Sequence, residues 1–144
     1  KAIFITHGGT EHIGGLQDLL REEGGKIPVF CPDSQGTPGA LVLGDASKVT
    51  YGRVEVQALR TPGHCEAHNC YVVTVPAAPA AAPLLITGDT LFAGSIGKAF
   101  FCRQSLTANL RRMLEHLPEN TVIAPGHGPL TTIKNERRNN PFVA

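Results

Sequence analysis

The sequence predicts an α/β fold in which helices and strands form layers. Two observations lead to this fold class. Short runs of β-branched and other apolar residues alternate along the chain with segments of helical spacing. Several of these runs lead into a turn rich in glycine or proline that carries a histidine or an aspartate. A sheet that gathers polar side chains at one edge, with helices on its faces, explains both observations.

Seven short segments have the composition of strands. β-Branched and apolar residues dominate them, and turn residues bound most of them. In chain order, strands are expected at Ala2–Thr6, Ile27–Phe30, Val49–Tyr51, Val54–Leu59, Tyr71–Val75, Leu84–Thr87 and Thr121–Ala124. We expect the third and fourth to form a hairpin, because only a short turn separates them. A polar loop rich in Gly and Pro is expected from Asp33 to Gly39.

Two segments have helical periodicity. Leucines share one face of Ile13–Glu23, and Gly24 and Gly25 supply the end of that helix. Leu106–Leu117 has the stronger pattern, with its apolar side chains on a single face. The Ala/Pro-rich stretch 76–83 lies between two expected strands and is too rich in proline for a helix, so we expect a protruding loop insert there.

The composition limits the domain organisation and the function classes. With 144 residues the chain is expected to form one domain, residues 1–144. Thirteen Lys and Arg residues oppose twelve Asp and Glu residues, and a net charge of +1 does not point to nucleic acid or to a membrane surface. No apolar run approaches the roughly 20 residues of a membrane helix. Because the first residues read as a buried strand, we expect the domain to be incomplete at its N-terminus.

The cysteines indicate a reducing compartment. Cys31, Cys65, Cys70 and Cys102 show neither a C-x-x-C pair nor the density of a disulfide scaffold. Cys70 and Cys102 lie in apolar segments, where we expect buried free thiols. The expected location is therefore intracellular, in the cytoplasm or the mitochondrion.

Histidine and carboxylate side chains at the expected strand ends are the candidate site. His7 and His12 lie in a Gly-rich turn, Asp89 follows Gly88, and His64 and His127 each follow Pro-Gly. Such clusters suit zinc, iron or manganese, and a metal lowers the pKa of its bound water to about 7. A cysteine hydrolase using Cys65 beside His64 is a competing hypothesis, but neighbouring strand residues point in opposite directions. His116 lies on the polar side of the second helix and is expected to be an ordinary surface residue.

These segments together resemble the metallo-β-lactamase superfamily, and within it the short, single-domain glyoxalase II-like hydrolases. The resemblance runs from Lys1 to Ala144, and its most specific parts are Thr6–Gly15, Thr61–His64, Gly88–Gly97, Pro125–Pro129 and Glu136–Phe142. It implies an αββα sandwich with a two-metal site at one edge. It also implies N-terminal strands that this chain lacks, so that either further residues or a partner would cover the exposed sheet.

The resemblance further implies a reaction and a set of roles. In such enzymes a hydroxide activated by the metals attacks a thioester carbonyl, typically that of S-lactoylglutathione. Carried over by position, His7 and His64 would bind the first metal, His12 and His127 the second, and Asp89 would bridge them. Asp89 and Glu11 are thus the expected catalytic carboxylates, with Glu11 also a metal ligand. Lys98 matches the position that pairs with a glutathione carboxylate, although a solvated lysine explains it equally well.

Two positions depart from the family pattern His-x-His-x-Asp-His. Gly9 stands where the second histidine belongs, and Glu11 replaces the aspartate. His68, four residues after His64, is not expected to replace the lost ligand. The stretch Ala99–Cys102 also replaces an acidic and aromatic segment of the substrate loop. The metal site is therefore expected to be degenerate, with low metal occupancy.

Two functions remain open at this point. The first is a thioester hydrolase, weak or inactive, that uses one zinc, iron or manganese ion at Glu11, His12, Asp89 and His127. Iron-dependent persulfide oxidation is a variant of this hypothesis on the same ligands. The second is a pseudoenzyme, retained as a structural or assembly subunit of a larger complex, with a ribonucleoprotein as one such partner. The first function requires a small glutathione thioester as substrate, and neither requires a membrane.

Overall fold

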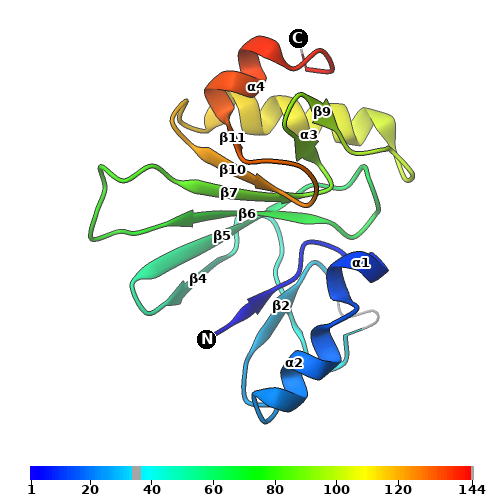
Figure 1. Cartoon of the computed structure of the whole chain (residues 1–144), viewed down its shortest axis with the longest axis vertical. Helices are drawn as coiled ribbons and strands as arrows, with labels where there is room; N and C mark the ends of the chain where they lie inside the picture. Colours follow the sequence, from blue (N-terminus) through cyan, green and yellow to red (C-terminus); the bar gives the residue numbers. More distant parts are fainter. Residues whose placement is uncertain (34–36, 144) are drawn as a thin grey trace.

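The computed structural model describes residues 1–33 and 37–143, which form four layers in the order helix, sheet, sheet, helix (Figure 1). The helices are α1 (Thr10–Ile13), α2 (Leu16–Glu22), α3 (Arg103–His116) and α4 (Ile133–Asn139). The strands are β1 (Ile3–Phe4), β2 (Val29–Cys31), β3 (Leu41–Val42), β4 (Lys48–Tyr51), β5 (Val54–Arg60), β6 (Asn69–Thr74), β7 (Leu84–Gly88), β8 (Leu91–Phe92), β9 (Ser95–Ile96), β10 (Val122–Pro125) and β11 (Thr131–Thr132). The predicted αββα sandwich is confirmed.

The larger sheet has six strands in the order β11-β10-β7-β6-β5-β4. The strands β4 to β7 pair antiparallel with their neighbours in the chain, whereas β10 lies parallel to β7. The smaller sheet, β1-β2-β3, is parallel, and β8 and β9 form a separate two-stranded hairpin. In Figure 1, α3 and α4 lie on one side of the larger sheet, and the smaller sheet with α1 and α2 lies on the other.

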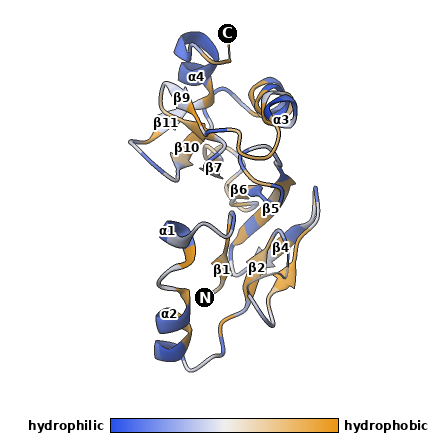
Figure 2. Ribbon diagram, turned by 90° about the vertical axis from the view of Figure 1, so that its right-hand side faces the viewer, coloured by the Kyte–Doolittle hydropathy of each residue, from blue (hydrophilic) through white to orange (hydrophobic). Residues whose placement is uncertain are grey.

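Three apolar clusters fill the spaces between the four layers. The side chains of α3 pack with the larger sheet, for example Leu110 against Leu85 and Ile123. Between the two sheets lie the ring of Phe30 from β2 and that of Tyr71 from β6. A third cluster joins the smaller sheet to α2. Figure 2 shows the same division, since hydrophobic ribbon lies mainly along the inner strands and hydrophilic ribbon along the outer helices.

Strand β6 separates two of these clusters through its alternation. Cys70 and Val72 face the α3 side, while Tyr71 between them faces the smaller sheet. The Tyr71 hydroxyl donates a hydrogen bond of 2.6 Å to the carbonyl of Ile5, and the Asn69 amide donates one of 2.9 Å to the carbonyl of Thr6. These two bonds attach the end of β1 to the larger sheet, immediately before His7.

The predicted hairpin and the predicted second helix are confirmed as β4–β5 and α3. The helix predicted at Ile13–Glu23 is divided, because the chain turns at Gly14 and Gly15 between α1 and α2. The sequence did not predict β3, β8, β9, β11 or α4. Four of these are two-residue strands, and α4 buries the charged Glu136, so none has a clear apolar period. Residues 34–36 of the loop expected at 33–39 lie outside the described residues.

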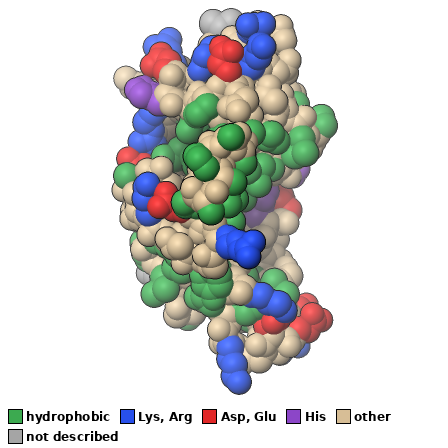
Figure 3. All heavy atoms as spheres, turned by 90° about the vertical axis from the view of Figure 1, so that its left-hand side faces the viewer, with side chains coloured by type: hydrophobic (Ala, Val, Ile, Leu, Met, Phe, Trp, Pro, Cys, Tyr) green, Lys and Arg blue, Asp and Glu red, His purple; other side chains and the backbone are tan. Residues whose placement is uncertain are grey.

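The 76–83 segment lies between β6 and β7, and its residues are exposed or half-buried. It extends beyond the larger sheet at the left of Figure 1. Figure 3 views that side of the molecule and shows apolar side chains gathered over its middle. Across 1–33 and 37–143, no helix combines the length and the apolar character needed to cross a bilayer.

All four cysteines are free, and they differ in burial. Cys70 is fully buried, as predicted, and burial raises the pKa of its thiol to about 11. The expectation that Cys102 is buried is wrong, because this residue is only half-buried, at the N-cap of α3. Phe100 and Phe101, which precede Cys102, suggested a core position, but both side chains are exposed.

Candidate metal centre

Strand direction explains why the candidate ligands meet. The strands β5 and β7 are each antiparallel to β6, and β10 is parallel to β7, so all three end at the same edge of the larger sheet. His64, Asp89 and His127 follow these three ends. A register shift between Ala124 and Pro125 redirects the chain before His127. The smaller sheet contributes His7 after β1, and α1 contributes Glu11 and His12.

One group of side chains at this edge consists of Glu11, His12, Asp89 and His127. Their ligand atoms all lie within 4.8 Å of one another. The Nε2 atom of His12 is 3.3 Å from Oδ1 of Asp89, and Nε2 of His127 is 3.5 Å from Oδ2. The Glu11 carboxylate lies 3.7 Å from His127 Nε2. The longer side chain of Glu11 therefore still reaches the centre.

A second group consists of His7, His64 and Asp89, and its ligand atoms also lie within 4.8 Å of one another. Asp89 belongs to both groups and is almost fully buried. His64 Nε2 lies 3.7 Å from Asp89 Oδ2. The structure thus brings together all six residues that the sequence placed at the metal site.

Hydrogen bonds on the far ring nitrogens orient two of these histidines. The Nδ1 atom of His64 is 2.9 Å from the carbonyl of Lys98, so Nδ1 carries the proton and donates it. Its Nε2 atom then presents a lone pair to the centre. His7 Nδ1 lies 3.1 Å from the Thr6 hydroxyl. Burial, together with the neighbouring His12, lowers the pKa of His7 to about 4, so its ring is neutral near pH 7.

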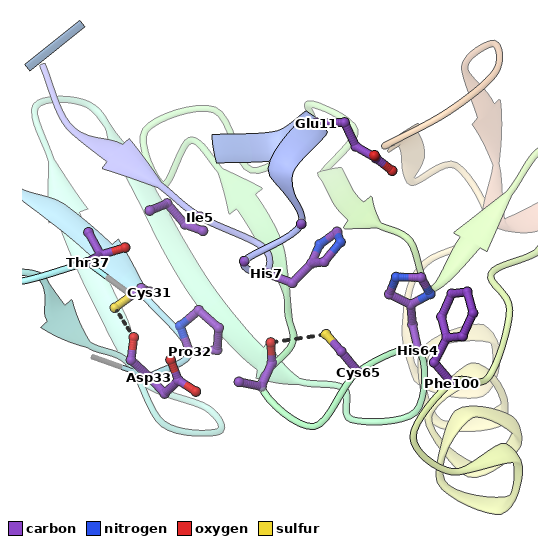
Figure 4. Close-up of a pocket in the computed structure, with 13 residues that line it drawn as sticks. Ile5, His7, Glu11, Cys31, Pro32, Asp33, Thr37, His64, Cys65 and Phe100 are labelled. Atoms are coloured by element: carbon purple, nitrogen blue, oxygen red, sulfur yellow. Dashed lines mark hydrogen bonds between the residues drawn. The ribbon is translucent and has the colours of Figure 1, made fainter. Parts of the chain in front are cut away.

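A cavity of about 420 Å³ opens beside the His7, His64 and Asp89 group. Figure 4 shows His7 and His64 at one side of it, with Phe100 next to His64 and with Cys31 and Pro32 on the opposite wall. Its described lining contains Glu11 and Asp33 as charged residues, and none of the described lining residues is Lys or Arg. A substrate bound here would have its reacting group next to the histidines.

Comparisons with known proteins support this arrangement. No family model matches the chain. It is similar to the Bacillus subtilis (strain 168) protein YqgX, whose name describes it as a probable metallo-hydrolase. The two are 29% identical over 99% of this chain and 75% of YqgX. It is 30% identical to the hydroxyacylglutathione hydrolase of Edwardsiella ictaluri (strain 93-146), over 88% of this chain and 47% of that protein. The chain therefore spans about half the length of the curated hydroxyacylglutathione hydrolases that it matches.

Solved structures share the whole described fold. BLEG-1, a B3 metallo-beta-lactamase, is 28% identical with a TM-score of 0.78, over 99% of this chain and 76% of that one. The crystal structure of TTHA1623 in a di-iron-bound form is 30% identical with a TM-score of 0.76, over 98% and 76% of the two chains. The chain belongs to the metallo-β-lactamase superfamily. ETHE1 from Myxococcus xanthus, at 27% identity, has a TM-score of 0.80 over 98% of this chain and 61% of that one.

Gly9 departs from the metallo-β-lactamase pattern in a way that the structure explains. A Cβ atom at this position would lie 2.9 Å from Nε2 of His7 and 3.1 Å from Cδ2 of His12. The rings of His7 and His12, whose centroids are 4.3 Å apart, therefore occupy the space that a side chain on residue 9 would need. A histidine at this position would require His7 to move.

Lys98 lies at the rim of the metallo-β-lactamase centre and not in its cavity. Its Nζ atom is 4.9 Å from the centroid of the Phe100 ring, and Phe100 lines the cavity. Its carbonyl, as described above, orients His64. The exposed ammonium group can meet a carboxylate of a substrate that extends past Phe100.

The competing cysteine hydrolase does not fit the structure. Burial raises the pKa of the Cys65 thiol to about 11, so the thiol is protonated near pH 7. The Sγ atom donates to the carbonyl of Ala67, and His64 uses Nδ1 for the Lys98 carbonyl. His64 therefore does not act as the base of a Cys65 nucleophile.

His68 is a residue whose place in the centre the sequence did not predict. It is fully buried behind His7 and His64, and it belongs to neither ligand group. Burial, with the nearby histidines, lowers the pKa of His68 to about 3. The sequence predicted correctly that His68 does not replace the lost ligand, but it does not show which way the ring faces, so no role could be predicted for it.

Proposed function

We propose that this chain is a metal-dependent hydrolase of the glyoxalase II-like kind that uses one metal ion, held by Glu11, His12, Asp89 and His127. One observation carries the proposal. The Nε2 atom of His12 and the Oδ1 atom of Asp89 are both buried, lack a hydrogen-bond partner, and lie 3.3 Å apart. Buried polar atoms without partners are costly. Two atoms that bind one zinc ion tetrahedrally at about 2.1 Å lie about 3.4 Å apart, which matches this separation.

The donor set also fits such an ion. Two imidazole nitrogens and two carboxylates suit zinc, iron or manganese. When bound, the ion supplies the chemistry of a hydrolase, because it lowers the pKa of a water to about 7 and polarises a carbonyl oxygen. Glu11 and His127 are exposed, so substrate and solvent reach this side of the centre. Asp89 is almost fully buried, and its backbone amide donates to Nε2 of His68.

The chain's own residues would orient a thioester of the S-lactoylglutathione type. The cavity beside His7 and His64 accepts the acyl group, and Phe100 covers one side of it. Lys98 at the rim pairs with a carboxylate of the thiol portion. Because Nδ1 of His64 donates to the Lys98 carbonyl, its Nε2 atom presents a lone pair to the same side of the centre. Support for this substrate comes from the hydroxyacylglutathione hydrolases among the relatives.

We expect weak turnover, because the second ligand group, His7, His64 and Asp89, lacks the histidine that the family pattern has at position 9. Three residues remain there, and restoring a fourth is opposed by the rings of His7 and His12. A centre that holds one ion well and a second one poorly would bind substrate without the paired-metal clamp of two-metal hydrolases.

The test is metal content and thioester hydrolysis of the purified protein, with two histidine variants. We expect zinc, iron or manganese at about one ion per chain, and slow hydrolysis of S-lactoylglutathione. This replaces the low occupancy expected from the sequence, because Glu11 reaches the ligand group. His127→Ala should lose both, whereas His116→Ala, an exposed histidine on α3, should keep both. A folded protein that carries no metal would refute the proposal and support the non-catalytic assembly subunit, a role for which recovery in a large protein or ribonucleoprotein particle would be the next check.

Iron-dependent oxidation is a second candidate function, favoured by the second ligand group. His7, His64 and Asp89 form a set of two histidines and one carboxylate beside the cavity, and this donor set with open positions is typical of non-haem iron oxygenases. Oxygen consumption with a small persulfide, dependent on ferrous iron and lost in His64→Ala, would distinguish this function from hydrolysis.

A further inference from the structure

We propose that His68 is a positioning residue of the metal centre, which holds the backbone of Asp89 and the ring of His7 in place. The inference rests on the proposed metal binding and goes beyond it, because His68 itself binds no ion in either ligand group. Its side chain is fully buried, so water does not satisfy its nitrogens.

Both ring nitrogens of His68 have partners on different segments of the site. The backbone amide of Asp89 donates to Nε2 over 3.3 Å. Nε2 therefore holds a lone pair, and Nδ1 carries the proton of the neutral ring. Nδ1 donates to the Thr61 hydroxyl at 2.9 Å, with the Thr90 hydroxyl farther away at 3.4 Å. The ring thus links the end of β5 to the residue that both ligand groups share.

The faces of the ring make a second connection. The ring of His68 is stacked on that of His7, with centroids 5.0 Å apart and planes inclined by 26°. His7 has its other neighbours in His12 and His64, so His68 supports the ring from behind. A shift of His68 would change the position of His7 and that of Asp89 together.

Gly88 shows that the fit around His68 is close. A Cβ at Gly88 would lie 2.9 Å from His68 Nε2 and 2.8 Å from Thr6 Oγ1, and the glycine has a φ of +48°. The turn that delivers the Asp89 amide to His68 therefore depends on a residue without a side chain. The absence of a side chain here lets the backbone approach the ring to hydrogen-bond distance.

The experiment separates the hydrogen-bond acceptor from the bulk of the ring. In His68→Gln the side-chain oxygen can still accept from the Asp89 amide, whereas His68→Leu fills similar space without an acceptor. Leu110→Ala serves as the control for general destabilisation, because Leu110 is buried in the α3 core away from the centre. For each folded variant, zinc affinity is measured by competition with a chromophoric chelator, and the visible spectrum of the cobalt(II) form reports ligand geometry.

We expect His68→Leu to bind zinc 10- to 100-fold more weakly, the range for lost supporting hydrogen bonds, and to change the cobalt spectrum. His68→Gln should stay within a few fold of the unaltered chain, and Leu110→Ala should lose stability without losing affinity. Equal affinity in His68→Leu, or equal losses in the Gln and Leu variants, would overturn the inference. If the unaltered chain binds neither metal, the proposed function fails and the positioning role falls with it.

A readout that needs no metal addresses the ring itself. Nitrogen-15 spectra of the metal-free protein should show His68 as the neutral tautomer protonated at Nδ1. A ring protonated at Nε2 would overturn the assignment, because it could not accept the Asp89 amide. If His68→Leu does not fold, Thr61→Val replaces it, since the valine removes only the hydroxyl that fixes the ring.

Discussion

Gly126→Ala should weaken metal binding by at least about 10-fold while the chain remains folded. Gly126 lies between Pro125 and His127, where its amide donates to the Gly88 carbonyl over 2.8 Å. A Cβ at this position would lie 2.4 Å from Oδ1 of Asp89, 2.8 Å from Cε1 of His12 and 3.0 Å from the Gly88 carbonyl oxygen. Folded proteins essentially never show such contacts below 3.0 Å. The distance from this Cβ to Oδ1 of Asp89 would have to grow from 2.4 Å to at least 3.0 Å, so the carboxylate would have to move by about 0.6 Å.

That displacement exceeds what a metal site tolerates, which is about 0.5 Å. We therefore expect zinc affinity to fall by at least 10-fold, and the overpacking to cost about 1–3 kcal/mol of the free energy of unfolding. The assay is a chelator competition for zinc, with circular dichroism and urea denaturation on the same samples. Gly8→Ala is the matched control, because a Cβ there meets nothing within 4 Å. Unchanged zinc affinity in Gly126→Ala would show that the ligands do not lie where the structure places them.

Three further predictions follow from other parts of the molecule. Glu136→Gln should lower the free energy of unfolding by about 2 kcal/mol in urea denaturation. The buried carboxylate accepts hydrogen bonds from Gly94, Thr131, Asn135 and Asn140, whereas an amide has only one acceptor oxygen. A change below about 0.5 kcal/mol would contradict this prediction. The metal-free protein should lose stability as the pH falls from about 6.5 toward 4, because His7 and His68 take up protons in the unfolded chain but have pKa values of about 4 and about 3 in the fold. The free energy of unfolding should fall by about 1.4 kcal/mol per pH unit for each histidine. Equal stability at pH 7 and pH 5 would refute this prediction. Replacing residues 76–83 with an Asn-Gly turn should change stability by less than about 1 kcal/mol and leave zinc affinity unchanged, since the segment is largely exposed and loop length alone costs little; a larger loss would mean that the segment supports the β6–β7 pair.

The sequence predicted the parts of the fold whose signal is local. The helix α3 carries its leucines at helical spacing, and the hairpin of β4 and β5 alternates around a short turn, so both were predictable. The αββα arrangement came from the family resemblance. Pairing partners beyond this hairpin were not predictable; the parallel alignment of β10 with β7, for example, joins segments far apart in the chain.

The candidate ligands His7, His64, Asp89 and His127 were predictable because each follows a strand end with a recognisable turn, whereas Glu11 was predicted only from the family resemblance. What the sequence could not show is where each ring points. The buried Nε2 of His12 opposite Asp89, and the stacking of His68 on His7, depend on contacts between segments more than 50 residues apart. The reach of Glu11 to within 3.7 Å of His127 likewise follows from the placement of α1 and not from the residue type.

Elements with mixed polarity were missed for a physical reason. The helix α4 has a fully buried glutamate and only one buried apolar residue, Ile133, so its sequence lacks an apolar face. Its stability comes from the Thr132 side chain, which accepts from the Asn135 amide at the helix start, and from the hydrogen bond that Glu136 accepts from Gly94 in the turn between β8 and β9. Helix propensities of the single residues do not predict such hydrogen bonds.

The candidate ligand residues come from both halves of the sandwich, so a bound ion would connect the two halves. His7, Glu11 and His12 belong to the half that contains the smaller sheet, whereas Asp89 and His127 belong to the larger sheet. The two halves also meet where the ring of Phe4 in the smaller sheet lies 5.4 Å from that of Tyr71 in the larger sheet. An ion bound at this edge would therefore link the two halves, and its binding free energy would add to the free energy of unfolding. Without the ion, the contact between the two halves would open more often, and the amides of β1 and β6 would exchange their hydrogens faster. Hydrogen exchange in these two strands would therefore report whether the ion is bound, although neither strand carries a candidate ligand.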